Sequence, residues 1–185
     1  MPFKKLHSDI REQLESLDIE TPTPIQSSSI PVIKSGVNTY CIAPKDSGKT
    51  STLVWTTLQK LKCQSAGNAP RAVVLVENKD RAMELYQTFL AYTKYNSLRV
   101  YVGHEQLHID IQKSEIFMGL DILISTPKTM NKLFLLNGVS TAQMKLISID
   151  DAGFLSQHSS YTALMSISQS IQKCQYVIYS EKMQP

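Results

Sequence analysis

Cysteine is scarce in this sequence, and the three that occur (Cys41, Cys63 and Cys174) have neither the number nor the spacing of a disulfide framework or a cysteine-rich metal site. Cys41 and Cys174 lie in apolar runs, which favours buried thiols in a reducing, intracellular setting. Long apolar stretches are missing too, since no run approaches the roughly 20 residues that a membrane-spanning helix needs. The amphipathic segment 1–13 lacks the pattern of a secretory signal. We therefore expect neither secretion nor association with a membrane.

An excess of charge of one sign is also missing. The chain has 19 Lys and Arg against 16 Asp and Glu, and this net charge of +3 permits nucleic-acid binding without arguing for it. Hydrophobic residues make up 42% and charged residues 19%, so the 185-residue chain has the composition and length of one globular domain. The sequence shows no internal repeat and no low-complexity segment.

Short apolar runs alternate with segments of helical periodicity. The runs that predict strands are 39–43, 72–76, 98–102, 121–125, 145–149 and 176–179. Helical spacing of apolar residues predicts an opening helix over 6–17, a short helix over 26–34 after a proline-rich loop, and further helices at 53–61, 82–89, 130–134 and 161–171. Nearly continuous apolar strands separated by amphipathic helices predict an α/β fold of doubly wound type, in which helices cover both faces of a parallel sheet.

The polar letters of interest follow the predicted strands. In a doubly wound sheet, ligands bind beyond the carboxyl ends of the strands. The segments that fall there are PKDSGKT, ENKDRA, GH, TPKT, DDAG and SEK, in chain order. The sequence therefore predicts a binding site along this edge of the sheet.

The segment APKDSGKT (43–50) matches the tail of the phosphate loop G-x-x-x-x-G-K-[ST], with alanine in place of the first glycine. Gly48 would let the backbone approach a phosphate, Lys49 would neutralise the β- and γ-phosphates, and the Thr50 hydroxyl could ligate magnesium. The plainer alternative is a Ser-Gly turn before a helix that happens to begin with Lys-Thr. Because the segment follows an apolar strand, we favour the phosphate loop.

The segment DDAG (150–153) ends the fifth predicted strand. Nucleotide hydrolases place one acid there to hold magnesium and a second to orient the attacking water. Asp150 and Asp151 fit these two catalytic roles, with Asp150 and Thr50 as the magnesium ligands. The alternative is that the two aspartates only cap a helix at a strand-to-helix turn. Because SGKT occurs in the same chain, we favour the magnesium and water site.

The segment PTPIQ (22–26) is not a general feature of phosphate-loop proteins. With it, the chain resembles the first, N-terminal RecA-like domain of the DEAD-box RNA helicases, over all 185 residues and with six motifs in family order. The resemblance implies a RecA-like sheet of the P-loop NTPase type, with a Q-motif region over 1–36 and a phosphate-loop core over 37–185. It also implies that the chain is part of a longer protein that contains a second RecA-like domain.

By the same resemblance, the expected cofactors are ATP and Mg²⁺, and the expected partner is single-stranded RNA held through its backbone. The residues implied for ATP are an adenine-stacking aromatic, a base-reading glutamine and the phosphate loop: Phe3, Gln26, Pro44, Lys45, Asp46, Ser47, Gly48, Lys49 and Thr50. The residues implied for RNA lie where the family has P-T-R-E-L-A, a double glycine and T-P-G-R: Lys79, Arg81, Gly103, Thr126 and Lys128. For each lysine, a solvated surface charge is the alternative.

Several family positions carry the wrong residue. Asp46 replaces the middle glycine of the loop, and a carboxylate about 5 Å from a phosphate charge costs about 3 kcal/mol, or about a hundredfold in affinity, at a dielectric of about 20. Asp151 replaces the water-orienting glutamate and is one methylene shorter. Gly153 replaces the last acid of D-E-A-D, and YSEKM (179–183) keeps only the serine of S-A-T. We therefore expect the coupling between the nucleotide site and the RNA site to be impaired.

These substitutions favour a degenerate helicase domain that acts in RNA metabolism as an RNA-binding or protein-scaffold module, with weak or absent ATP binding and hydrolysis. The alternative is a working ATP-dependent RNA helicase lobe that requires the second RecA-like domain. A phosphate-loop ATPase or kinase with another substrate is a third reading. The style of degeneration resembles the tudor-domain-containing helicase-like proteins of the piRNA pathway, which implies protein partners and a cytoplasmic location, in RNA granules.

Overall fold

A six-stranded parallel sheet forms the centre of the domain. The computed structural model describes residues 2–171 and 173–182. The strand order is β1-β6-β5-β2-β4-β3, and every pair of neighbouring strands is parallel. The strands are β1 (Thr39–Ile42), β2 (Ala72–Leu75), β3 (Val100–Gly103), β4 (Ile122–Ser125), β5 (Leu146–Ile149) and β6 (Gln175–Ser180). All six predicted strands are confirmed, within two residues at each end.

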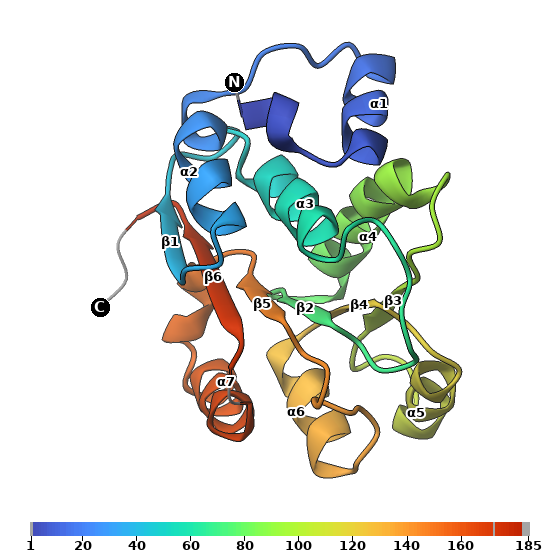
Figure 1. The fold of residues 1–185 in the computed structure, drawn as a ribbon. Coiled ribbons are helices and arrows are strands. Elements are labelled where there is room, and N and C mark those ends of the chain that lie inside the picture. The colour runs from blue at the N-terminus through green and yellow to red at the C-terminus, as the bar shows by residue number, and fades with distance from the viewer. Residues whose placement is uncertain (1, 172, 183–185) are drawn as a thin grey trace.

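Helices cover both faces of this sheet (Figure 1). One face carries the short 3-10 helix η1 (Pro2–Lys5) and the helices α1 (Ser8–Ser16), α2 (Pro24–Lys34), α3 (Lys49–Lys60) and α4 (Lys79–Thr93). The other carries α5 (Ile109–Phe117), α6 (Pro127–Leu135) and α7 (His158–Ser170), and a 3-10 helix, η2 (Ala152–Ser156), follows β5. Each face has its own apolar core, with Trp55 and Phe89 in the first and Met130 and Leu133 in the second. The predicted RecA-like α/β fold is confirmed.

Helix α5 is the element that the sequence does not reveal. Its segment begins Ile-Asp-Ile, which alternates like a strand, and its buried positions are Gln112 and Ile116. The Gln112 amide lies inside because it donates to the carbonyls of His104 and Leu107, both at 2.8 Å, and accepts from the His104 amide at 3.1 Å. A polar residue thus occupies a buried position at which a helical pattern is recognised by an apolar residue.

Helix α2 begins with a capping box. The Thr23 hydroxyl accepts from the Gln26 amide, and the Gln26 side chain accepts from the Thr23 amide at 2.9 Å. Pro24 occupies the first turn, where a missing N–H costs nothing. This cap places Gln26, which is 4% exposed, against the loop that follows β1.

The thiols are less uniformly buried than expected. Cys41 and Cys63 are buried, and burial raises their pKa values to about 11 and about 12, while Cys174 is half-buried. The prediction is therefore confirmed for Cys41 and only partly for Cys174. Among the described residues, no helix combines the length and apolar character that a membrane crossing requires.

Candidate functional site

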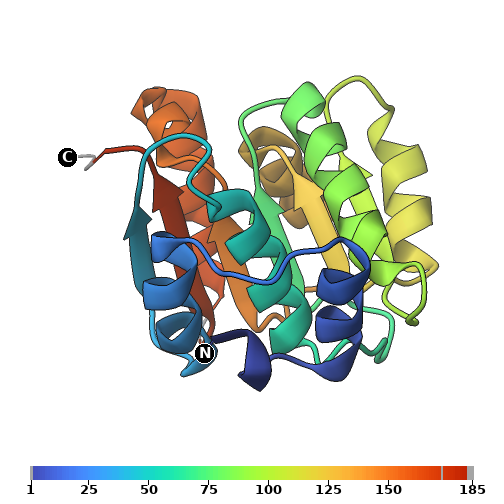
Figure 2. The same cartoon turned by 90° about the horizontal axis from the view of Figure 1, so that it is seen from above.

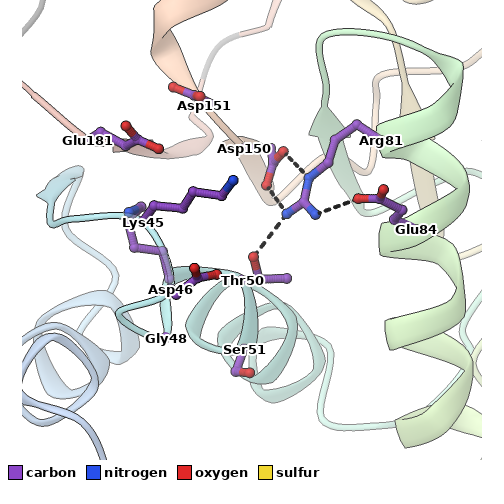
Figure 3. Close-up of a pocket in the computed structure, with 11 residues that line it drawn as sticks. Lys45, Asp46, Gly48, Thr50, Ser51, Arg81, Glu84, Asp150, Asp151 and Glu181 are labelled. Carbon is purple, nitrogen blue, oxygen red and sulfur yellow. Dashed lines mark hydrogen bonds and ion pairs between the residues drawn. The ribbon is translucent and has the colours of Figure 1, made fainter.

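A cleft of about 510 Å³ opens at the carboxyl edge of the sheet, where β1, β5 and β6 end and helices α3 and α4 begin (Figure 3). Figure 2 shows how the loops of that edge gather there. The residues that line the cleft are Lys45, Asp46, Gly48, Lys49, Thr50, Ser51, Arg81, Glu84, Asp150, Asp151 and Glu181. The structure therefore brings the phosphate loop together with both predicted catalytic aspartates.

Gly48 is required by the geometry of the loop. It is the N-cap of α3 with φ +99°, and a Cβ there would lie 2.6 Å from Gln26 Nε2 and 2.7 Å from Thr23 Oγ1. Gln26 Nε2 donates to the Gly48 carbonyl at 3.3 Å. The predicted base-reading glutamine is thus the link that fastens α2 to the phosphate loop.

Asp46 lies in the left-handed region, with φ +60°. A glycine would adopt this conformation without strain, whereas a residue with a side chain costs about 1–2 kcal/mol and aspartate tolerates it better than most. The Asp46 side chain is exposed at the wall of the cleft, so solvent screens its repulsion of a phosphate. The substitution therefore strains the backbone of the loop and adds repulsion toward a bound phosphate.

Lys49 turns back onto its own loop. Its ammonium group donates to the carbonyl of Ala43 and, at 2.6 Å, to that of Pro44. The Ser47 hydroxyl donates to the same Pro44 carbonyl, also at 2.6 Å. The loop is thus tied together from within, and a phosphate would have to compete with these carbonyls for the lysine.

Arg81 reaches from the first turn of α4 into the cleft and forms a two-pronged ion pair with Asp150. Its Nε donates to Asp150 Oδ2 at 2.7 Å and its Nη2 to Asp150 Oδ1 at 2.9 Å. The same Nη2 donates to Thr50 Oγ1 at 2.9 Å, and Nη1 donates to Glu84 Oε2 at 3.2 Å. The hydrogen bonds that Arg81 donates to Asp150 raise the pKa of Arg81 above its usual value. The Asp150 side chain is only 7% exposed and the Arg81 side chain is 30% exposed, so the carboxylate is shielded from solvent and the arginine is partly accessible.

This arrangement decides whether the residues fit magnesium. The two oxygen ligands that the resemblance implies, on Thr50 and Asp150, both accept hydrogen bonds from Arg81. Magnesium needs compact octahedral coordination by such oxygens. A permanent positive charge between them repels a second cation. The site as it stands does not fit magnesium.

The second catalytic candidate, Asp151, is also engaged. Asp151 Oδ1 accepts from the Gly153 amide at 3.0 Å and caps helix η2. Glu181, next to Ser180 at the end of β6, adds a further exposed carboxylate to the cleft wall. Met183, the last letter of YSEKM, lies outside the described residues.

The other predicted RNA residues do not line the cleft. Lys79 donates to Gln106 at 2.9 Å, and Thr126 caps α6 while its hydroxyl donates to Glu105 at 2.7 Å. Lys128 is exposed in the first turn of α6, and Gly103 ends β3, the neighbour of β4. Burial and the nearby Lys79 charge lower the pKa of His104, beside Gly103. Arg81 lines the cleft, where its guanidinium pairs with Asp150, and its contact with RNA stays a prediction.

Four more residues lie in surroundings that the sequence does not predict. Phe3 packs edge-on against Trp55, with ring centroids 5.3 Å apart, and does not line the cleft. His7, Asp9 and Cys63 bring possible metal-ligand atoms within 4.8 Å of one another, although no spacing in the sequence announces it. Burial and the Asp9 charge raise the pKa of Cys63 to about 12, so this thiol stays protonated at neutral pH.

The sequence does not predict that Arg81 contacts Asp150 and Thr50, and one signal could have revealed these contacts. Arg81 stands at the leucine position of P-T-R-E-L-A, where a helix packing against the sheet is expected to be apolar. β2 precedes α4 and pairs with β5, which ends immediately before Asp150. A cation at an apolar position beside a strand that ends in aspartate predicts an ion pair.

The comparisons with known proteins agree with this fold. Residues 23–180 match the DEAD/DEAH box helicase family. The probable ATP-dependent RNA helicase ddx42 of Dictyostelium discoideum is 31% identical over 137 residues, which cover 72% of this chain and 14% of that protein. The human probable ATP-dependent RNA helicase DDX43 is 28% identical over 153 residues, which cover 79% of this chain and 23% of that protein. The chain thus spans less than a quarter of the length of either relative.

Solved structures show the same fold. A DEAD box protein from the hyperthermophile Methanococcus jannaschii superposes with a TM-score of 0.88 at 17% identity, covering 97% of this chain and 49% of that one. The dbp5 protein of S. cerevisiae, solved bound to nup159 and gle1, superposes with a TM-score of 0.85 at 16% identity, covering 97% and 47%. With its fold, its motif order and the match over residues 23–180, the chain belongs to the DEAD/DEAH box helicase family.

Proposed function

We propose that this domain is a degenerate N-terminal lobe of a DEAD-box protein, which acts in RNA metabolism as an RNA-binding module with weak or absent ATP binding and hydrolysis. Several of its relatives are named as ATP-dependent RNA helicases, which supports a role with RNA. In a longer protein, a second RecA-like domain would complete the RNA grip. A scaffold role toward proteins is the outcome that remains if RNA does not bind.

The observation that carries this proposal is the charge balance of the cleft. Its lining has three cationic side chains, Lys45, Lys49 and Arg81, against five carboxylates, Asp46, Glu84, Asp150, Asp151 and Glu181. A nucleoside triphosphate is itself strongly anionic. An anion entering a site with excess negative charge is repelled, and the repulsion is greatest where solvent is excluded.

The alternative is an active ATP-dependent helicase lobe that lacks only its second RecA-like domain. The phosphate-loop conformation at Gly48 and the presence of Lys49 and Thr50 favour it. Magnesium-dependent ATP binding by the domain separates the two readings. A dissociation constant in the low micromolar range supports the active lobe and contradicts the degenerate one.

RNA binding is tested through the two lysines at the carboxyl ends of β2 and β4. We expect single-stranded RNA to bind with an affinity that falls as salt rises, because phosphate contacts release counterions. Replacing both Lys79 and Lys128 with alanine should weaken binding at low salt. It should also reduce the slope of log affinity against log salt concentration by the amount expected for about two lost phosphate contacts. The measurement is fluorescence anisotropy over a salt series, with Arg11→Ala, an exposed charge on α1, as the matched control. Unchanged affinity in the double variant would contradict the proposal that Lys79 and Lys128 contact RNA phosphates.

The cellular setting follows from the same proposal. The resemblance to tudor-domain-containing proteins of the piRNA pathway and the buried, unpaired thiols Cys41 and Cys63 support a cytoplasmic location, in RNA granules. Fluorescence microscopy of the tagged full-length protein checks this placement. Granular cytoplasmic signal is expected, and a nuclear or secreted protein would contradict it.

A further inference from the structure

The guanidinium of Arg81 occupies the space between the two oxygen ligands that a magnesium ion would use. A single nitrogen, Nη2, donates to both Thr50 Oγ1 and Asp150 Oδ1, each at 2.9 Å. The remaining bonds, from Nε to Asp150 at 2.7 Å and from Nη1 to Glu84 at 3.2 Å, leave only one of its N–H donors free of a protein partner. Figure 3 shows the fork lying between α3, α4 and the end of β5.

The fold holds this arginine in place. Asn78 caps α4 by accepting from the Arg81 amide at 2.9 Å, which sets the residue in the first turn of the helix. β2 and β5 are neighbours, with Leu75 opposite Ile149, and the Asp150 amide donates to the Leu75 carbonyl at 3.0 Å. Arg81 and Asp150 are therefore brought together by sheet register and helix capping rather than by a flexible loop.

Electrostatics explain why the pair persists. The Asp150 side chain is 7% exposed, and a buried carboxylate without a cation is strongly disfavoured. Arginine is always charged and its planar fork matches a carboxylate. A divalent ion could reach Asp150 and Thr50 only by displacing the guanidinium and its hydrogen bonds. One of the two positive charges that magnesium would bring to these oxygens is already supplied by the chain.

We propose that Arg81 replaces the magnesium ion of this site: it neutralises Asp150, joins it to Thr50, and makes the cleft independent of divalent cations. A phosphate-bearing ligand that enters the cleft does so without a metal. This role deepens the proposed function and rests on it, because both require that the cleft descends from a nucleotide site. It differs from loss of the site, since the metal position is filled by a built-in cation.

The test compares the magnesium response of the wild-type domain with that of Arg81→Leu, which restores the side chain that the family carries at this position. Thermal denaturation is followed in EDTA and in millimolar magnesium chloride, with sodium chloride at matched ionic strength. Wild type should show the same Tm in the EDTA, magnesium chloride and sodium chloride samples. The Arg81→Leu variant should have a lower Tm in EDTA and should gain several degrees in magnesium, because Asp150 and Thr50 are then free to bind the ion. Calorimetric titration with magnesium alone should detect binding only in the variant.

Two further variants establish the cause. Combining Arg81→Leu with Asp150→Asn should abolish the magnesium response, because the anionic ligand is gone. Arg11→Leu, which removes an exposed arginine from α1, should behave as wild type. A magnesium-dependent Tm rise in the wild type that Asp150→Asn removes would overturn the proposal. The wild-type measurement can overturn the proposal even if Arg81→Leu does not fold, and a folded Arg81→Leu without any magnesium response would also overturn it.

Failure of this role and failure of the proposed function look different. ATP that binds wild type tightly and equally in magnesium and in EDTA would contradict weak nucleotide binding and support the role of Arg81. Absence of ATP binding by wild type, together with a folded Arg81→Leu that ignores magnesium, would contradict the role of Arg81 and leave the proposed function standing.

Discussion

Asp46 shows what one side chain does to a phosphate loop. Its φ of +60° is a conformation that favours glycine, and its carboxylate lies on the wall of a cleft that already has an excess of negative charge. Both effects oppose a bound phosphate, the first by straining the loop and the second by repulsion. Because the side chain is exposed, screening keeps its electrostatic effect below the value for a buried charge.

Replacing Asp46 with glycine should therefore raise nucleotide affinity, by up to about a hundredfold at low salt and by less as salt rises. The fold should be kept with little change in stability, since relief of the left-handed strain of about 1 kcal/mol is offset by the greater freedom of glycine in the unfolded chain. Titration of a fluorescent ATP analogue at two salt concentrations measures the change. Asp46→Asn, which removes the charge but keeps the side chain, separates repulsion from strain.

If nucleotide affinity does not move in Asp46→Gly, the carboxylate is not the obstacle. The block would then lie in the other departures, which are the fork of Arg81 on Asp150 and the ammonium of Lys49 on its loop carbonyls.

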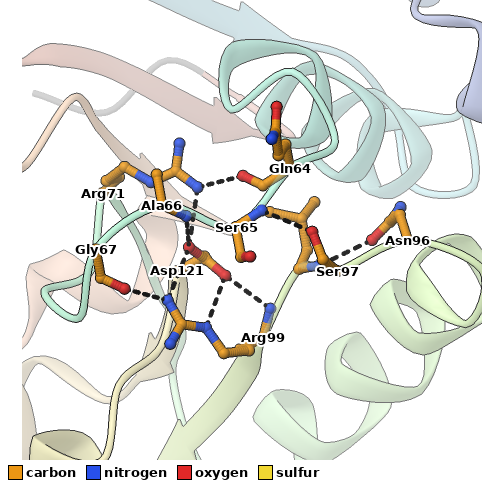
Figure 4. Close-up of polar contacts among 10 residues, drawn as sticks. Gln64, Ser65, Ala66, Gly67, Arg71, Asn96, Ser97, Arg99 and Asp121 are labelled. Atoms are coloured by element: carbon orange, nitrogen blue, oxygen red, sulfur yellow. Dashed lines mark hydrogen bonds and ion pairs between the residues drawn. The ribbon is translucent and has the colours of Figure 1, made fainter.

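The buried carboxylate of Asp121 organises three elements at the opposite edge of the sheet (Figure 4). It stands just before β4 and accepts from the Arg71 side chain at 2.9 Å, from Arg99 Nε at 3.1 Å, and from the amides of Arg99 and Ala66 at 2.9 and 3.1 Å. Burial alone would raise the pKa of Asp121, but the hydrogen bonds from Arg99 and Arg71 outweigh it and hold the pKa below its usual value. This one side chain joins the starts of β2, β3 and β4.

Asp121→Asn should lower the free energy of unfolding by about 3–5 kcal/mol, because it leaves the nearly buried guanidinium of Arg71 without its anion. Urea denaturation followed by circular dichroism measures the change. The matched control is Asp110→Asn, since Asp110 is an exposed aspartate in the first turn of α5. A loss below about 1 kcal/mol would show that the network adds little.

The same variant predicts a pH effect with a definite sign. The folded-state pKa of Asp121 is depressed, so its contribution to stability is present above the unfolded value of about 3.9 and disappears as pH falls through the folded value. The difference in unfolding free energy between wild type and Asp121→Asn should therefore narrow below about pH 4. A difference that stays constant down to acid unfolding would contradict the assigned pKa direction.

At the scale of elements, the sequence predicts what is set by apolar patterning. All six strands and the helices that pack on them through apolar residues follow from periodicity, as the continuous runs at 72–75 and 122–125 show. Helix α5 does not follow, because Gln112 fills its buried position with an amide that satisfies two carbonyls. Apolar patterning carries no information about a polar side chain that is buried because it bonds to the carbonyls of the loop before its helix.

The candidate site divides in the same way. The gathering of the phosphate loop with Asp150 and Asp151 follows from strand order and motif spacing, so it can be predicted. The position of Arg81 cannot be read from the motif alone, because it depends on a side chain that reaches from α4 to the end of a neighbouring strand. Phe3 likewise packs against Trp55, a contact that its place in the family motif does not predict.

At the scale of the whole molecule, the domain keeps the architecture of its family, and the proposed change lies in the chemistry of the cleft. The sheet superposes on solved DEAD box structures over 97% of the chain. The cleft at its carboxyl edge nevertheless holds more carboxylates than cations, and its arginine pairs with the aspartate that would serve a metal. This charge balance supports the proposed module that binds without turnover.

The most direct measurement is calorimetric titration of the wild-type domain with ATP in the presence of magnesium. The lining of Asp46, Asp151 and Glu181 around the loop, with Arg81 on Asp150, predicts weak or undetectable heat, and no gain over the same titration in EDTA. A magnesium-dependent dissociation constant in the low micromolar range would contradict the account and identify the chain as an active nucleotide-binding lobe.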